Sequence, residues 1–354
     1  MSVTASRSGA PGNRSRQRGA VAIMVAFFLL MILGFAALAV DSFHLFMVRN
    51  ELQNDADAAV LAGAGYLFTP ASSTPDFPAA EAKAALAIRL NRSFRGTLTE
   101  GDITSGYWNV TDGFQPLPMT PTADDAAALR VTVRRGAEGA GNSGPVELIF
   151  GDFVGTDVLP VSASATAVVV PPGVVYPGGL FPIALTRCLF QNFWDYANNN
   201  PKLDPVTGDP YIFRIGSAYH YAGCSAGQWT SFKLDRNDTP TIRDLITNGN
   251  PDSLAISDPT WLEPGVKTTI YGYTNDCSAA GDRSCEFVTM PVIITDDVET
   301  HSSTPVVAFA CVRILRAEGG SDKFVEVQMI MGCHIDGSGG GPYYGTTLPP
   351  KLVQ

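Results

Sequence analysis

The stretch RQRGAVAIMVAFFLLMILGFAALAVD, from Arg16 to Asp41, determines how the rest of the chain is interpreted. Ala20 to Val40 is an unbroken apolar run without a charged residue. As a helix it would be about 30 Å long, which is the thickness of the hydrocarbon core of a bilayer. Because a helix in a soluble protein is rarely apolar on every face, the run predicts a transmembrane helix over residues 20–40.

The charges that flank the run predict its orientation. Basic residues precede it, whereas acidic residues outnumber basic ones directly after it. Basic flanks stay in the cytoplasm. Residues 1–19 are therefore expected to be a basic cytoplasmic tail, and residues 41–354 to be exported. The basic residues of the tail are Arg7, Arg14, Arg16 and Arg18.

A cleaved signal peptide is the alternative, because Ala37-Leu38-Ala39 has the small-x-small form that signal peptidase recognises. The run is longer than the core of a usual signal peptide, however, and apolar or small residues continue beyond it at spacings of three and four. One long helix, half in lipid and half exported, is therefore predicted, with a face suited to close contact between helices. This face, the packing stripe, consists of Leu45, Val48, Leu52, Ala56, Ala59 and Gly63.

A composite pattern over these residues has a counterpart in a known family. It combines Arg18-Gly19, the apolar run, Asp41, Leu52-Gln53-Asn54, Asp57-Ala58-Ala59 and Ala62-Gly63-Ala64. The segment closely resembles the N-terminal segment of TadG-like Flp pilus-assembly proteins, which belong to the tight-adherence secretion and pilus machinery of bacteria. The resemblance implies an anchor in the inner membrane, a periplasmic ectodomain, and other subunits of the pilus machinery or pilin-like proteins as partners.

The resemblance adds a third interpretation of the opening stretch. Pilin-like proteins are cut after a Gly by a prepilin peptidase, and the apolar helix is retained. The cut would fall here between Gly19 and Ala20, although Met24 stands where typical prepilins carry Glu. A protein processed in this way would be a minor pilin or an adhesin in the fibre.

The composition limits the classes of protein that remain. Charged residues make up only 16% of the chain, the net charge is −10, and Gly and Pro are frequent. This profile is typical of an exported β-rich protein and disfavours nucleic acid as a partner. No motif for a small-molecule substrate, a cofactor or a metal is found, so no cofactor is expected.

The six cysteines all follow residue 187, and their even number in the exported half predicts disulfides. Cys277 and Cys285 bracket a short loop and are the easiest pair to close. A hairpin around Gly319 would hold Cys311 and Cys333 about 17 Å apart along its strands, too far for a bond. These two are therefore predicted to pair with Cys188 and Cys224, in an order that stays open.

The exported part is predicted to be α+β. Residues 41–170 are expected to hold the long helix, a short helix over 79–94 and a small antiparallel sheet, in a pilin-like layout. Val161, Ala163, Ala165 and Ala167 would share one strand face, where small residues allow another layer to approach closely. The Pro- and Gly-rich residues 171–182 are the predicted linker.

Residues 183–354 are predicted to form a predominantly antiparallel β domain that contains the disulfides. Strands are expected over 211–219, 267–274 and 285–295, followed by the hairpin. Only 239–249 is expected to be helical, with Thr239 as N-cap and Gly249 as the stop. The Gly- and Pro-rich end of the chain is either a disordered tail or an extended strand that docks on a sheet edge, and the ordered extended segment is favoured.

One short motif suggests catalysis. GCSAG, residues 223–227, fits the Gly-x-Ser-x-Gly elbow of α/β hydrolases, with Ser225 as nucleophile and His301 or His334 as base. The residues after it make a poor helix, so a tight turn beside a disulfide is favoured and no enzyme is predicted. The chain is thus expected to be a structural or interaction protein of Flp pilus assembly. The alternatives are the minor pilin and a secreted periplasmic binding protein or hydrolase.

Overall fold

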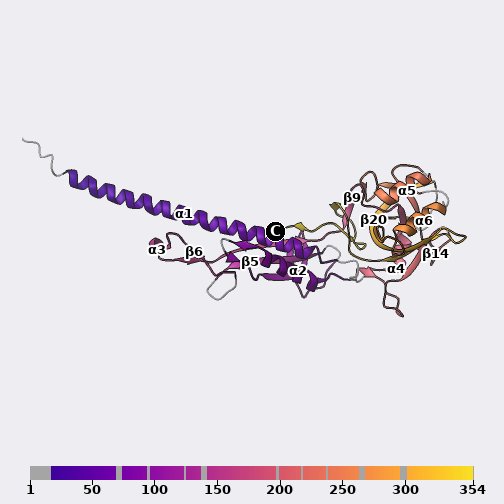
Figure 1. The fold of residues 1–354 in the computed structure, drawn as a ribbon, viewed down its shortest axis with the longest axis horizontal. Coiled ribbons are helices and arrows are strands. Elements are labelled where there is room, and N and C mark those ends of the chain that lie inside the picture. The colour runs from indigo at the N-terminus through magenta and orange to yellow at the C-terminus, as the bar shows by residue number, and fades with distance from the viewer. Residues whose placement is uncertain are drawn as a thin grey trace, which may run out of the picture.

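The protein is elongated, with a long helix at one end, a helix-and-sheet domain in the middle and a β-rich domain at the other end (Figure 1). The structure, a computed structural model, describes residues 17–68, 74–93, 96–122, 125–136, 142–196, 199–216, 218–236, 238–262, 268–295 and 301–353. Most of the expected basic tail, residues 1–16, lies outside the described residues.

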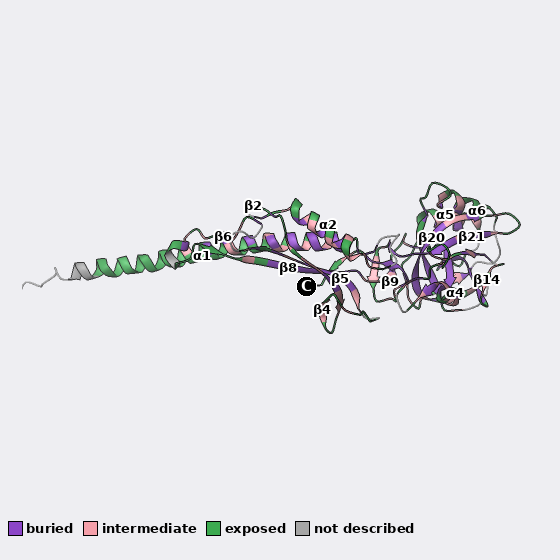
Figure 2. Ribbon diagram, turned by 90° about the horizontal axis from the view of Figure 1, so that it is seen from below, coloured by how far each residue is buried: buried purple, intermediate pink, exposed green. Residues whose placement is uncertain are grey.

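Helix α1, Gln17–Ala64, is continuous, which confirms the single long helix expected from the sequence. Its first half is exposed and its second half is largely buried, as Figure 2 shows by colour. The change follows the sequence, because the apolar run occupies every face of the helix, whereas the packing stripe occupies only one. Only the second half of α1 is therefore part of the folded domain.

Helix α2, Phe77–Leu90, lies beside the second half of α1. It begins two residues before the expected start, because the Asp76 carboxylate accepts a hydrogen bond from the Ala79 N–H at 3.0 Å. Pro78 occupies the first turn, where its missing N–H costs nothing. Its buried face, Ala80, Ala84 and Ile88, is made of residues with helical spacing.

The sheet of the middle domain is antiparallel, and α1 crosses it over β8 and β5. Ala163, Ala165 and Ala167 are buried on β8, as expected from their small size. The outermost strand, β25, comes from the far end of the chain, which confirms that this segment docks on a sheet edge. In order, the strands are β25 (Lys351–Leu352), β8 (Val161–Val168), β5 (Ala126–Arg135), β3 (Asp102–Asn109) and β4 (Gly113–Pro116).

The C-terminal domain is built around five strands that close into a small β-barrel, called the ring below. The ring closes because β20 pairs with β18 through its first residues and with β19 further along. Within the ring, only the β10–β19 pair is parallel. The ring consists of β10 (Ile183–Thr186), β16 (Gly227–Phe232), β18 (Pro259–Leu262), β20 (Ser302–Glu318) and β19 (Phe287–Ile293), and β21 (Phe324–Met329) and β13 (Ile212–Ile215) extend it from β20. The predominantly antiparallel β domain is thereby confirmed.

Three helices cover the ring: α4 (Arg187–Phe193), α5 (Thr239–Asn248) and α6 (Thr268–Cys277). The strand expected over 267–274 was wrong, because this segment forms α6. Its β-branched and aromatic residues have strand propensity, but Ile270, Tyr271 and Thr274 are buried at helical spacing against the ring. Tertiary packing therefore decides this segment.

The start of α5 also differs from the expectation. The N-cap is Asp238, one residue before the expected Thr239, and its carboxylate accepts a hydrogen bond from the Thr241 N–H at 2.9 Å. Gly249 ends the helix with φ 72°, in the left-handed region that favours glycine, as expected.

The segment 171–182 connects the two domains through a small sheet of its own. Strand β9, Pro172–Val175, pairs with β17 (Leu254–Ala255) on one side and β23 (Gly337–Gly339) on the other. Val175, Leu180 and Phe181 are buried, so the connection is packed rather than extended into solvent.

Short strand pairs complete the fold: β1 (Arg92–Ser93) with β2 (Gly96–Thr97), β6 (Val146–Glu147) with β7 (Val158–Leu159), β11 (Trp194–Asp195) with β12 (Asn200–Pro201), β14 (His220–Tyr221) with β15 (Cys224–Ser225), and β22 (Cys333–His334) with β24 (Thr346–Thr347).

Candidate functional site

The exposed half of α1 is an apolar surface that no other part of the described chain covers. Val21 to Leu38 contain large hydrophobic side chains that are more than half exposed, among them Phe27, Phe28 and Phe35. Within the described residues, α1 is the one helix long and apolar enough, by length and composition, to cross a membrane. Water is a poor solvent for such a surface, and its length fits the hydrocarbon core of a bilayer.

The packing stripe lies inside the protein. Val48, Leu52, Ala56 and Ala59 have no exposed surface, and Leu45 packs against the same core. At Gly63 a Cβ atom would lie 2.5 Å from Leu129 Cδ2 and 2.8 Å from the Ala80 carbonyl oxygen. The close contact that the stripe predicts is therefore made within the chain, because the chain's own sheet and α2 occupy the stripe.

The candidate cleavage positions lie in regular helix. Gly19 and Ala20 are in the first turns of α1, and Ala37 to Ala39 are in its middle. No break in α1 marks either position.

Three disulfides confirm that all six cysteines are bonded. Cys277 pairs with Cys285, as expected, but the other two pairs differ from the expectation. Cys188 pairs with Cys224, and Cys311 pairs with Cys333. The predicted exclusion of the last pair was wrong.

The reason for this error lies in the end of β21. The hairpin partners are Glu318 and Phe324, so the turn is centred further along the chain than Gly319, and β21 ends at Met329. Gly332 then has φ 90°, so the chain leaves the extended conformation just after β21. Cys333 lies beside Cys311, and its N–H is 3.1 Å from the Cys311 sulfur. The prediction had assumed that the strand continued straight through Cys333.

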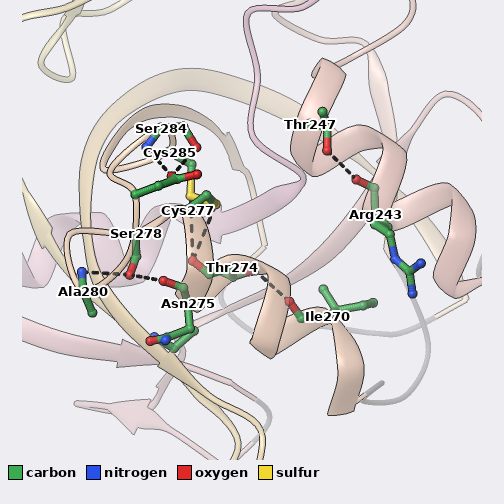
Figure 3. The surroundings of a disulfide bond; sticks show 12 residues. Arg243, Thr247, Ile270, Thr274, Asn275, Cys277, Ser278, Ala280, Ser284 and Cys285 are labelled. Carbon is green, nitrogen blue, oxygen red and sulfur yellow. Dashed lines mark hydrogen bonds between the residues drawn. A yellow bond between two sulfur atoms is a disulfide. The ribbon is translucent and has the colours of Figure 1, made fainter.

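Figure 3 shows the Cys277–Cys285 disulfide with the hydrogen bonds around it, and backbone bonds also fasten the loop to the ring. The Cys285 N–H donates to the Cys277 carbonyl at 2.7 Å, and the Ser278 hydroxyl donates to the Asn275 carbonyl at 2.8 Å. The N–H groups of Ala279 and Ala280 donate to β20 at its bulge, at 3.0 and 3.1 Å. The disulfide thus holds a compact loop whose N–H groups bind the backbone carbonyls at the bulge of β20.

The GCSAG motif lies on a β-hairpin. Ala222 and Gly223 have positive φ and form the turn, and Ser225 lies on β15 opposite His220. The Ser225 carbonyl accepts a hydrogen bond from the Thr186 hydroxyl at 2.6 Å. A hydrolase elbow requires a strand followed by a helix, and here a strand pair is found instead.

The interdomain joint, where the end of α1 meets the C-terminal domain, contains a hollow of about 470 Å³. Phe68 and Tyr343 meet across it, with ring centroids 5.2 Å apart. Burial raises the pKa of Tyr343 well above its ordinary value, and burial together with Asp125 raises that of Tyr107. Both hydroxyl groups therefore stay neutral at neutral pH.

A second hollow of about 670 Å³ lies on the C-terminal side of the joint. His334 lines it, and its Nδ1 lies 2.9 Å from the Thr347 hydroxyl. Burial lowers the pKa of His334, although the Phe68 carbonyl opposes this shift. His334 therefore acts as a neutral contact within the joint at neutral pH.

The fold defines a class of protein: a long helix whose apolar half is uncovered and whose other half is the core of a helix-on-sheet domain. Residues 19–65 match the family model described as putative Flp pilus-assembly TadE/G-like, and residues 62–167 match the one described as putative Tad-like Flp pilus-assembly. Residues 19–167 thus match TadG-like Flp pilus-assembly proteins, and these matches support a role in Flp pilus assembly. No curated protein and no solved structure matches the chain.

Proposed function

We propose that the protein is a permanently anchored component of Flp pilus assembly in the inner membrane, with its two domains in the periplasm. The apolar half of α1 holds the chain in the bilayer with the N-terminus in the cytoplasm. The ectodomain acts as a structural and interaction module toward pilin-like proteins or other subunits of the machinery. Catalysis has no part in this proposal.

The continuity of α1 is the observation that supports it best. The same helix provides the uncovered apolar surface and, through Leu52 and Ala59, the buried centre of the middle domain. A helix without a break transmits position and orientation from the membrane to the sheet. The docking of β25 on β8 ties the C-terminal domain to this unit as well. The whole ectodomain is therefore held at a defined place above the bilayer.

The test compares three forms of the protein in cells that lack it. The first is the unchanged chain, the second carries an unrelated single-span anchor of the same orientation in place of residues 1–40, and the third carries a cleavable signal peptide there. If anchorage is the function of this segment, the first two restore surface pili and the third does not. Restoration by the soluble third form would refute the proposal.

The minor-pilin alternative is favoured by one observation, the layout of a half-exposed helix packed on an antiparallel sheet (Figure 2). N-terminal sequencing and fractionation separate the two functions. A chain that begins at Ala20 and is found in sheared surface fibres is a pilin. An uncut chain, or one that lacks only Met1, in the inner-membrane fraction is an assembly component. A soluble chain that begins at Val40 would support the secreted binding protein or hydrolase.

A further inference from the structure

A small lobe projects from the middle domain toward the apolar half of α1 (Figure 1). This juxtamembrane lobe, Val146–Leu159, consists of β6, the single-turn helix α3 (Gly151–Val154) and β7. The strands pair through Val146 with Leu159, and the Leu148 N–H donates to the Asp157 carbonyl at 2.8 Å. At Gly151 a Cβ would lie 2.4 Å from the Thr156 carbonyl oxygen, so the tight closure of the lobe requires glycine there.

Asp41, the first residue after the apolar run, holds the lobe against α1. Its carboxylate accepts hydrogen bonds from the Ile149 N–H at 2.8 Å and from the Phe150 N–H at 3.1 Å. Asp41 is only 6% exposed, so the lobe removes this charge from the surface of the helix. Carboxylates that accept bonds from backbone N–H groups make strong, charge-assisted contacts. The lobe is therefore fixed at the level where the apolar run ends.

The uncovered apolar surface continues past the end of the run. On α1, Phe43, Phe46 and Met47 are 67%, 61% and 40% exposed, although Asp41 and His44 face the protein. From Val21 to Met47 this surface is about 40 Å long, about 10 Å more than the hydrocarbon core of a bilayer. The additional length of apolar surface lies on the part of α1 beside the lobe.

The lobe itself adds to this surface. Ile149 is 60% exposed, Val158 43% and Leu159 37%, and no described residue covers them. Its exposed charged residues, Glu147, Asp152 and Asp157, are all acidic. Exposed apolar side chains beside a membrane-spanning helix fit the boundary between headgroups and acyl chains, and the acidic residues exclude attraction by anionic lipids.

We propose that the juxtamembrane lobe is a second membrane contact, inserted into the headgroup region of the exported leaflet through Ile149, Val158 and Leu159. The occupant of this surface is the lipid of the same bilayer that holds α1, because the Asp41 carboxylate fixes the lobe to α1 at the end of the apolar run. The inference rests on the proposed anchorage of α1. A second contact beside a single helix prevents the ectodomain from tilting and rotating freely above the membrane.

The test uses the full-length protein in phosphatidylcholine–phosphatidylethanolamine vesicles, with the fluorophore NBD on single introduced cysteines. Ile149→Cys and Val158→Cys report on the lobe, and both positions are exposed, so the fold tolerates them. Phe28→Cys reports on the span. Val110→Cys is the matched aqueous control, because Val110 is 96% exposed at the end of the sheet farthest from the lobe. Quenching is measured with lipids spin-labelled near the headgroup or deep in the chain, and with aqueous iodide.

The expected result is quenching of the two lobe probes by the shallow label, about twofold stronger than by the deep label, with the opposite order at Phe28 and none at Val110. Asp41→Asn should weaken the shallow quenching at Ile149 and leave Phe28 unchanged. Added anionic phosphatidylglycerol should not increase quenching at the lobe.

Three results would overturn the proposal in different ways. If the lobe probes are as accessible to iodide as the probe at Val110 while the probe at Phe28 is quenched by lipid, α1 is an anchor but the lobe does not contact the membrane. Lobe probes shielded from iodide but not quenched by lipid show that protein, such as a second copy, covers the surface. Loss of lipid quenching at Phe28 removes the proposed anchorage itself.

Discussion

Replacing Gly63 by alanine places a methyl group in a space that is already filled. The new Cβ would lie 2.8 Å from the Ala80 carbonyl oxygen and 2.9 Å from Ala84 Cβ, both on α2, and 2.5 Å from Leu129 Cδ2. The leucine methyl can move, but the backbone of α2 must shift by several tenths of an ångström. Because one of the crowded atoms belongs to the backbone of α2, such overpacking costs about 2–3 kcal/mol, the upper part of the usual range. The helix regains about 1 kcal/mol from the better propensity of alanine.

The expected net loss is therefore about 1–2 kcal/mol in the free energy of unfolding of the middle domain. Gly65→Ala is the matched control, because its nearest atoms lie 3.7 Å away. Hydrogen exchange by mass spectrometry on the full-length protein in detergent should show about 5–30-fold faster exchange in α2 and β5 for Gly63→Ala only. Equal rates for both variants would refute the intramolecular packing of the stripe. Normal exchange with lost piliation would instead place another subunit on Gly63.

Three further changes test other parts of the fold. Burial and Glu51 raise the pKa of Asp55 to about 6, so the native protein loses stability as pH rises from about 4 through 6. In urea titrations, the free energy of unfolding of Asp55→Asn should therefore exceed that of the native chain by about 1–2 kcal/mol near pH 8 and by less near pH 4. A difference that does not depend on pH would contradict this expectation. Deleting residues 351–354 removes the pairing of β25 with β8 and the hydrogen bond from the Val353 N–H to the Thr166 carbonyl. Hydrogen exchange in β8 should therefore be faster, and small-angle scattering should show a wider range of positions of the two domains. Unchanged scattering would mean that the packed segment 171–182 is enough to hold the domains together. Non-reducing peptide mapping should join Cys311 to Cys333, and replacing both by Ser should cost about 3 kcal/mol, whereas a peptide that joins Cys311 to Cys188 would contradict the fold of the C-terminal domain.

The elements that were predicted well are those specified by neighbouring residues. The uninterrupted helix from the apolar run to Gly63 and the small face of β8 follow from periodicities within a few turns or strand positions. The same holds for the disulfide between Cys277 and Cys285, whose sequence separation is 8. The predicted starts of α2 and α5 were wrong by two residues and one residue, because the side chains of Asp76 and Asp238, just before the expected starts, cap these helices.

The long apolar helical stretch, the helical periodicity beyond it and the family pattern were determined by the sequence alone, because apolar runs and side-chain spacing act within one segment. The partner of the packing stripe, the pairing of Cys311 with Cys333 and the strand that receives β25 were decided only by the tertiary structure. Each depends on where a distant segment is placed, as when the register of the hairpin and the positive φ of Gly332 together bring Cys333 to Cys311. The lobe held by Asp41 belongs to the same group, because a carboxylate after an apolar run does not reveal which backbone, more than a hundred residues away, will donate to it.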